Sequence, residues 1–153
     1  MNKSLSFNSV EIQNFQLNRN PMLFLDFAFD VIPGRSAKAW KYFSFNEWYF
    51  QGHFPDDPNV PSTVQVECLD QTFLMAVLSL KENVGHKAEA VQIDATFRKK
   101  IVPGDKLRVQ AQVDSLKRGI AKGGATGYIN DDIACEAKFT VILPHILENF
   151  LKR

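Results

Sequence analysis

The sequence predicts an α+β protein in which an antiparallel β-sheet is wrapped around one long central helix. Apolar residues alternate with a period of two in both halves of the chain, and turn signals separate these runs. One central stretch follows helical spacing instead. The chain has 153 residues, so we expect residues 1–153 to form a single domain around one core.

The first predicted elements are a pair of strands. Pro33-Gly34 separates an alternating apolar run from residues 37–45, the expected return strand, because a Pro-Gly turn between two such runs is typical of a hairpin. The first strand is expected to place its apolar side chains on one shared face. These side chains are Leu23, Leu25, Phe27, Phe29 and Val31.

A long helix is predicted from Ser62 to about Lys81, a stretch that contains neither glycine nor proline. Ser62 or Thr63 would cap its N-terminus directly after Pro61, and Gly85 lies just beyond its far end. Apolar residues occupy so much of the helix circumference that we expect the helix to be buried within the sheet.

Three or four further strands follow the helix. The first alternates from Val91 to Phe97 and stops at the Pro103-Gly104-Asp105 turn. Two more alternate from Leu107 to Val113 and from Ile133 to Val141. Short strands joined by tight turns indicate an antiparallel sheet. Residues 144–153 are predicted to form a short amphipathic tail.

Composition narrows the classes of function. Hydrophobic residues make up 45% of the chain and charged residues 23%, as is typical of a soluble globular protein. A net charge of +1 lacks the basic excess of a nucleic-acid-binding protein. Two cysteines without paired spacing favour a reducing compartment, and there is neither a signal-peptide pattern nor a run of ~18 apolar residues. We therefore expect a cytoplasmic protein without a membrane span.

One loop and the start of the predicted helix contain the candidate chemistry. Three prolines restrict the backbone around His53, and Glu67 follows in about the second helical turn. A buried carboxylate is costly unless it is paired or functional, so the two residues are a plausible acid/base pair. Taken alone, however, the pattern favours a structural histidine and a glutamate that compensates the helix dipole. The prolines are Pro55, Pro58 and Pro61.

The segment Gln51-Gly52-His53-Phe54-Pro55, followed by Pro58, Pro61, Glu67 and Gln71, resembles the signature of the β-hydroxyacyl-acyl carrier protein dehydratases. Phe97–Asp105 is similar to the FRRPVVPGD segment of that family, and the resemblance extends roughly from Leu17 to Leu143. It implies the hotdog fold, in which a sheet wraps one central helix.

The resemblance also implies an activity, the removal of water from a (3R)-3-hydroxyacyl thioester to give the trans-2-enoyl thioester. His53 would take the α-proton, and Glu67 would protonate the departing hydroxyl group. The Gly52 N–H and the N–H groups near Ser62 or Thr63 would polarise the thioester carbonyl. No metal or organic cofactor is implied.

Partners follow from the same resemblance. The substrate would be attached to acyl carrier protein, an acidic protein that a basic cluster could dock. The basic cluster within the Phe97–Asp105 segment consists of Arg98, Lys99 and Lys100. A homodimer is expected, with His53 of one subunit meeting Glu67 of the other, and three such dimers could form a hexamer. No nucleic acid partner is expected.

Two departures from the family pattern leave other functions open. Ser62 stands where the family usually has glycine, and Asp70 occupies a position that is usually small and apolar. Asp70 is three residues from Glu67 and should lie on nearly the same helix face, close to Gln71. The alternatives are a hotdog acyl thioesterase and a non-catalytic subunit that binds acyl thioesters or acyl carrier protein.

Overall fold

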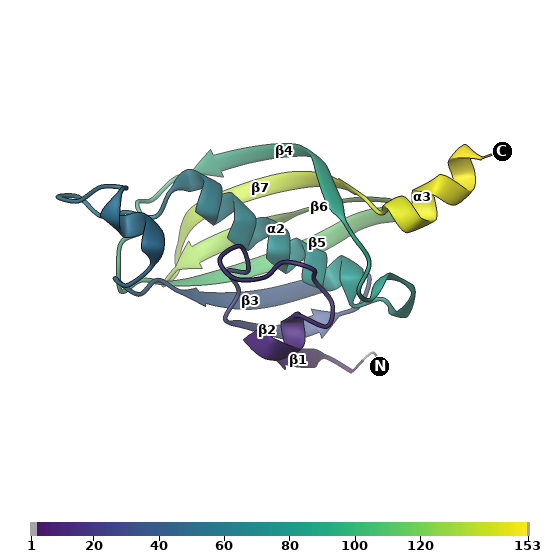
Figure 1. The fold of residues 1–153 in the computed structure, drawn as a ribbon, viewed down its shortest axis with the longest axis horizontal. Helices are drawn as coiled ribbons and strands as arrows, with labels where there is room; N and C mark the ends of the chain where they lie inside the picture. Colours follow the sequence, from purple (N-terminus) through teal and green to yellow (C-terminus); the bar gives the residue numbers. More distant parts are fainter. Residues whose placement is uncertain (1–2, 153) are drawn as a thin grey trace.

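The computed structural model describes residues 3–152 and shows a curved antiparallel sheet that holds one long helix in its concave face (Figure 1). This α+β arrangement confirms the predicted hotdog architecture. In chain order the elements are β1 Leu5–Asn8, α1 Ser9–Ile12, β2 Phe27–Ile32, β3 Ser36–Tyr42, the 3-10 helix η1 Trp48–Gln51, α2 Ser62–Leu78, the 3-10 helix η2 Lys81–Asn83, β4 Glu89–Phe97, β5 Lys106–Lys117, β6 Ile120–Ile129, β7 Asp132–Ile142 and α3 Pro144–Leu151.

The seven strands form a single sheet in the order β1-β2-β3-β5-β6-β7-β4. Each neighbouring pair is antiparallel, as the short turns between alternating runs predicted. β5, β6 and β7 follow one another through tight turns, whereas β4, which precedes them in the chain, lies at the outer edge beside β7. β4 therefore ends the sheet on one side and β1 ends it on the other.

The helix α2 is buried on almost all sides, as predicted, with thirteen of its seventeen residues buried. Its predicted side-chain cap is wrong. Pro61 is the N-cap residue, its carbonyl accepts the Gln65 N–H at 3.1 Å, and no side chain caps the helix. Because the helix begins one residue earlier than a serine cap requires, the side chains of Ser62 and Thr63 are exposed in its first turn.

The strands predicted after the helix are confirmed, and they form the wall against which α2 packs. Leu107, Val109 and Phe139 are buried on the inner face, and the Phe139 ring stacks on Phe73 of α2 at 5.6 Å. Gly123 permits this close approach, since a Cβ at that position would lie 2.6 Å from the Phe73 ring.

The predicted face of the first strand is wrong. Ala28 and Val31 of β2 point into the core, whereas Phe27 and Phe29 lie on the outer face of the sheet. Asp30 has a φ of 47° within an irregularity of the β2–β3 pairing, and this extra residue shifts the alternation by one. The outward rings stack on each other and on Trp40 of β3, which removes part of their apolar surface from water.

β1 and α1 are additional to the predicted elements. The Asn8 side chain accepts the N–H groups of Val10 and Glu11, and Glu11 Oε2 accepts the Asn8 N–H at 2.8 Å. This reciprocal capping stabilises a single helical turn, which is too short to leave a periodic pattern in the sequence.

A buried lysine connects β3 to the segment that precedes His53. Lys41 is 6% exposed, and its Nζ lies 2.6 Å from Glu47 Oε1 and 3.8 Å from Asp26 Oδ2. Glu47 is the N-cap residue of η1, which leads directly into the loop that carries His53. The ion pair therefore fixes the approach of that loop to the sheet.

We predict that Lys41→Met lowers the free energy of unfolding by roughly 2–4 kcal/mol, because the partly buried Glu47 carboxylate loses its counter-ion. Lys38→Met is the matched control. Lys38 belongs to the same strand and pairs with the exposed Asp30, so its loss should cost less than about 1 kcal/mol. Urea unfolding measures both values, and equal effects of the two substitutions would contradict the role assigned to Lys41.

Candidate active site

The loop that carries His53 is closed by bonds between its two arms. The Asn59 N–H donates to the His53 carbonyl at 3.0 Å, and His53 Nδ1 lies 3.0 Å from the Asn59 carbonyl oxygen. Phe54 and Asp57 exchange two further backbone hydrogen bonds, each of 3.1 Å. We call residues 53–59 the His53 loop, and these four bonds hold the imidazole in one orientation.

The bond to Asn59 also fixes where the imidazole can accept a proton. A carbonyl oxygen can only accept, so in this contact Nδ1 carries the hydrogen. The neutral ring then has its lone pair on Nε2. The Phe54 ring stacks on the imidazole with a centroid distance of 4.3 Å, which restrains the ring further. His53 is thus arranged to act as a base through Nε2.

The three predicted docking cations are all engaged in ion pairs. Arg98 binds Glu136 at 2.9 Å, and Lys99 binds Asp132 at 2.8 Å and lowers the pKa of that carboxyl group. Lys100 binds both oxygens of Asp57, at 2.6 and 2.7 Å. Because Asp57 belongs to the His53 loop, the last pair ties this loop to the segment after β4.

Glu67 lies in the second turn of α2 and accepts hydrogen bonds from two side-chain amides. Gln71 Nε2 donates to Glu67 Oε1 at 2.9 Å, and Asn18 Nδ2 donates to the same oxygen at 3.4 Å. Gln71 is itself held by the Met22 carbonyl at 2.6 Å and by the Phe24 N–H at 2.9 Å. The segment before β2 therefore positions the carboxyl group of Glu67.

Asn18 is a site residue that the sequence analysis missed. It lies 49 residues before Glu67, in a stretch without regular secondary structure, so no periodicity links the two positions. The resemblance does identify Gln71, which is part of the family signature. Its side chain reaches Glu67 because it follows that residue by one helical turn.

Asp70 lies one turn beyond Glu67 and is a buried carboxyl group. It is 8% exposed, and its Oδ1 accepts no hydrogen bond within residues 3–152. Burial, together with the nearby charge of Glu67, raises the pKa of Asp70 to about 7. The expected proximity to Glu67 is present, and Asp70 is therefore partly protonated near neutral pH.

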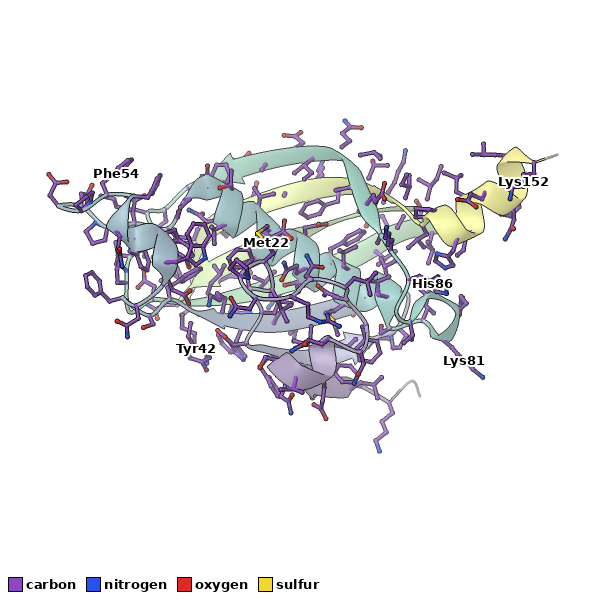
Figure 2. All side chains as sticks on the ribbon, in the orientation of Figure 1. Met22, Tyr42, Phe54, Lys81, His86 and Lys152 are labelled. Carbon is purple, nitrogen blue, oxygen red and sulfur yellow. The ribbon has the colours of Figure 1, made fainter. Side chains whose placement is uncertain are left out.

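His53 and Glu67 are held by different segments of the chain. Phe54, which stacks on His53, lies at one end of the molecule in Figure 2. Met22, whose carbonyl binds Gln71, lies over the middle of α2 in the same view. Across residues 3–152 no hydrogen bond joins His53 to Glu67, and the two side chains share no hydrogen-bonding partner.

The candidate oxyanion donors differ in their availability. The Gly52 N–H donates to the Tyr49 carbonyl at 3.2 Å at the end of η1. The N–H groups of Ser62 and Thr63 have no acceptor within residues 3–152, as is usual for the first turn of a helix. The start of α2 therefore presents free donors, together with the positive end of the helix dipole.

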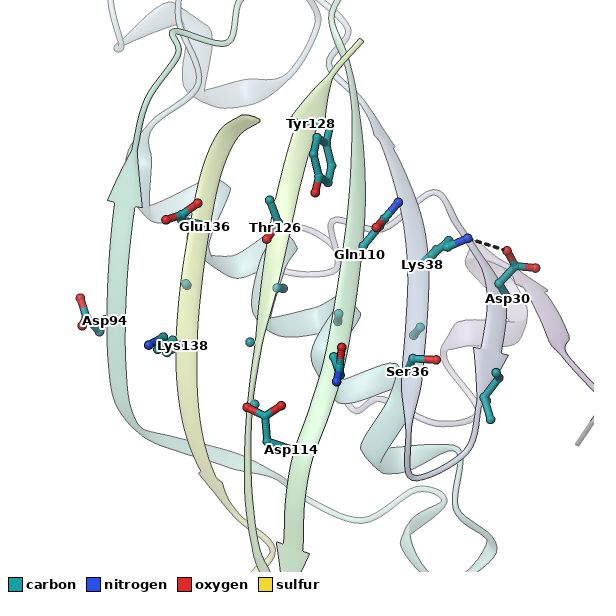
Figure 3. A pocket seen from close by; sticks show the side chains of 18 of the residues that line it. Asp30, Ser36, Lys38, Asp94, Gln110, Asp114, Thr126, Tyr128, Glu136 and Lys138 are labelled. Atoms are coloured by element: carbon teal, nitrogen blue, oxygen red, sulfur yellow. Dashed lines mark hydrogen bonds and ion pairs between the residues drawn. The ribbon is translucent and has the colours of Figure 1, made fainter. Parts of the chain in front are cut away.

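A hollow of the surface lies apart from these residues. It has a volume of about 940 Å³ and lies on the outer face of the sheet, opposite α2, among polar side chains such as Gln110, Thr126 and Lys138 (Figure 3). In the part of the chain that is described, no three His, Cys, Asp or Glu side chains gather in a way that could hold a metal ion. No helix there is long and apolar enough to cross a membrane.

We predict that Asp70→Asn stabilises the protein at alkaline pH and has little effect on stability at acidic pH. The folded state holds the Asp70 proton up to about pH 7, whereas the unfolded chain releases it near pH ~4. The parent should therefore lose up to about 1.4 kcal/mol per pH unit between these values, and the variant should not. Urea unfolding at about pH 5 and about pH 8 measures the difference. If the parent and the variant differ in unfolding free energy by the same amount at both pH values, another group compensates the charge of Asp70, which would contradict the prediction.

Comparison with solved structures supports the fold. Zebrafish thioesterase superfamily member 2 superposes with a TM-score of 0.68 over 90% of this chain and 99% of that chain, at 13% sequence identity. The dehydratase heterocomplex ApeI:P from Xenorhabdus doucetiae gives a TM-score of 0.56 over 71% of this chain and 88% of that chain, at 19% identity. At these identities the likeness concerns the fold alone.

Sequence comparison is more specific. The chain is 40% identical over 134 residues to the 3-hydroxyacyl-[acyl-carrier-protein] dehydratase FabZ of Roseiflexus sp. (strain RS-1). The aligned region covers 87% of this chain and 94% of that protein. The chain is also 41% identical over 129 residues to the protein of the same name from Chloroflexus aggregans, an alignment that covers 84% and 90%. The model of the FabA-like domain matches residues 17–138. The chain belongs to the FabA-like domain family.

Proposed function

We propose that this protein dehydrates 3-hydroxyacyl thioesters of acyl carrier protein to trans-2-enoyl thioesters. The observation that carries the proposal is the geometry of the His53 loop, which places the hydrogen on Nδ1 and leaves Nε2 as a base. Glu67 supplies the acid, held in place by Gln71 and Asn18. Relatives named as 3-hydroxyacyl-[acyl-carrier-protein] dehydratases, 40% and 41% identical to this chain, support the same reaction.

The reaction needs one base and one acid. His53 Nε2 takes the α-proton, the electrons of that bond form the Cα–Cβ double bond, and the bond from Cβ to the hydroxyl oxygen breaks. Protonated Glu67 gives its proton to the departing oxygen, which leaves as water. The free N–H groups of Ser62 and Thr63 stabilise the negative charge that develops on the thioester oxygen. The Gly52 N–H could join them only by releasing the Tyr49 carbonyl.

The exposed apolar edge of the sheet supports a homodimer, in which His53 of one subunit and Glu67 of the other would form two composite sites. β4 is the edge strand beside β7, and its apolar side chains are uncovered, with Ile93 45% and Phe97 44% exposed. These residues lie opposite Phe139 and Cys135, which are buried on the inner face. An exposed apolar edge strand is a template for pairing with a second strand.

A second copy that pairs through β4 would extend the sheet and cover Ile93 and Phe97. Such an arrangement is symmetric, because the same strand contributes to both sides of the interface. It would bring the His53 loop of one subunit toward the α2 helix of the other. Assembly of three dimers into a hexamer and a cytoplasmic location remain further predictions of the same account.

Docking of acyl carrier protein remains part of the proposal. The side chains of Arg98, Lys99 and Lys100 are 53%, 40% and 52% exposed, so each could exchange its present carboxylate for one on an acidic partner. Such an exchange at Lys100 would release Asp57 and loosen the His53 loop. Docking through Lys100 would therefore be coupled to movement of the base.

The test is an assay for the conjugated enoyl thioester, whose ultraviolet absorbance rises as dehydration proceeds. We expect the purified protein to form it from a 3-hydroxyacyl thioester of acyl carrier protein. His53→Ala and Glu67→Gln should each reduce kcat by at least about 100-fold, because each removes one partner of the proton transfer. Both variants should bind the acylated carrier with unchanged affinity.

A free-thiol measurement in the same reactions separates the alternatives. Thiol release without enoyl product would identify a thioesterase and contradict dehydration. Tight binding of the acylated carrier with neither product would identify a non-catalytic binding subunit. Enoyl formation that survives in both variants would show that His53 and Glu67 are not the catalytic pair.

A further inference from the structure

The two amides that hold Glu67 bind the same oxygen of its carboxyl group. Gln71 Nε2 donates to Oε1 at 2.9 Å, and Asn18 Nδ2 donates to Oε1 at 3.4 Å. Within residues 3–152 no hydrogen bond is made to Oε2. The carboxyl group is therefore held asymmetrically, with one oxygen occupied by protein donors and the other free.

This asymmetry distinguishes the two oxygens chemically. In a protonated carboxyl group one oxygen carries the hydrogen and the other is a carbonyl that only accepts. An oxygen that already accepts two N–H groups is the carbonyl, since a hydrogen placed there would oppose both donors. We infer that Asn18 and Gln71 direct the proton of Glu67 to Oε2, and that Asn18 is a positioning residue for the acid step. This inference rests on the proposed dehydratase function.

Asn18 is held firmly enough to act in this way. Arg19 Nη1 donates to the carbonyls of Gln16 and Asn18, at 2.7 and 2.8 Å, and its Nη2 reaches the Gln13 carbonyl at 3.1 Å. Gln16, which is fully buried, donates from its side chain to the Gln71 carbonyl at 2.7 Å. The segment that carries Asn18 is therefore attached to α2 beside Gln71, which fixes the position of one amide relative to the other.

The donors also act during the reaction. When Oε2 releases its proton to the departing hydroxyl oxygen, negative charge develops on the carboxylate and spreads to Oε1. Two N–H groups are already in place to stabilise this charge, so no reorganisation is needed at that moment. Removing Asn18 should weaken this stabilisation and allow the carboxyl group to turn its proton away from the substrate.

A pair of substrates separates the acid step from the rest of the reaction. Elimination from a 3-hydroxybutanoyl thioester requires a proton for the leaving oxygen. Elimination from the matching 3-chlorobutanoyl thioester does not, because chloride leaves as an anion and only the α-proton must be taken. Both reactions give the same enoyl thioester, so one absorbance assay follows both, with the enzyme-free rate subtracted.

We expect Asn18→Ala to lower kcat for the hydroxy substrate roughly fivefold to tenfold, the effect of one hydrogen bond to a developing charge. The rate with the chloro substrate should change less than about twofold, since the acid is not used. Asn18→Asp is the second variant, for use if Asn18→Ala folds poorly. It is nearly isosteric but replaces the donor with a carboxylate, so it should slow the hydroxy substrate selectively as well. Asn14→Ala is the matched control, because Asn14 is exposed in the same segment and is expected to affect neither rate.

The outcomes are distinguishable. If Asn18→Ala slows the reactions of both substrates equally, the residue has a merely structural role. If it slows neither reaction, the donor is not used. Either result overturns the inference. The proposed function is checked in the same experiment. Glu67→Gln should lose only the hydroxy reaction, and His53→Ala should lose both. A parent protein that eliminates chloride but never water lacks the acid step, which overturns the function and the inference with it.

Discussion

The burial of α2 inside the curved sheet is the constraint on which the rest of the structure depends. A helix with thirteen buried residues of seventeen must have its polar side chains satisfied by the protein. Gln71 and Glu67 are satisfied by the segment from Gln16 to Phe24, which lies along the helix and is bound to it by backbone and side-chain amides. The candidate acid thus occupies a defined position, because the polar side chains of a buried helix bind protein groups and not water. Asp70 shows the cost of the same burial, since its carboxyl group lacks a partner for Oδ1 within residues 3–152 and its pKa is raised to about 7.

One edge of the sheet, β4, leaves apolar side chains exposed, and this feature links the fold to the proposed dimer. β4 closes one side of the sheet with apolar side chains still exposed, while the His53 loop lies at one end of the molecule. In the proposed dimer, a rigid base from one chain and a rigid acid from the other complete each site. Rigidity serves this arrangement, because the bonds to Asn59, the ion pair of Lys100 with Asp57 and the Lys41–Glu47 pair restrain the loop before any partner arrives.

Most of the fold could be predicted from the sequence, because its long elements have strong periodicity. The buried helix, the hairpin at Pro33-Gly34 and the strands β4, β5 and β7 follow directly from apolar spacing. The inner face of β2 could not be predicted, since the irregularity at Asp30 reverses the alternation. The His53 and Glu67 pair emerged only through resemblance, because spacing alone favours structural roles for both residues. The contribution of Asn18 was out of reach, since this residue lies 49 positions before Glu67 in a segment without regular structure, where no periodic signal links it to the helix.

The most direct test of the account is complementation between two inactive variants. His53→Ala and Glu67→Gln proteins are mixed, unfolded and refolded together, so that subunits exchange at random. If each site takes His53 from one subunit and Glu67 from the other, half of the dimers should contain one intact site, and enoyl formation should recover to about a quarter of the parent rate. Each variant refolded alone should stay inactive. Failure of the mixture to recover, with mixed dimers shown to be present, would contradict a site shared between two copies.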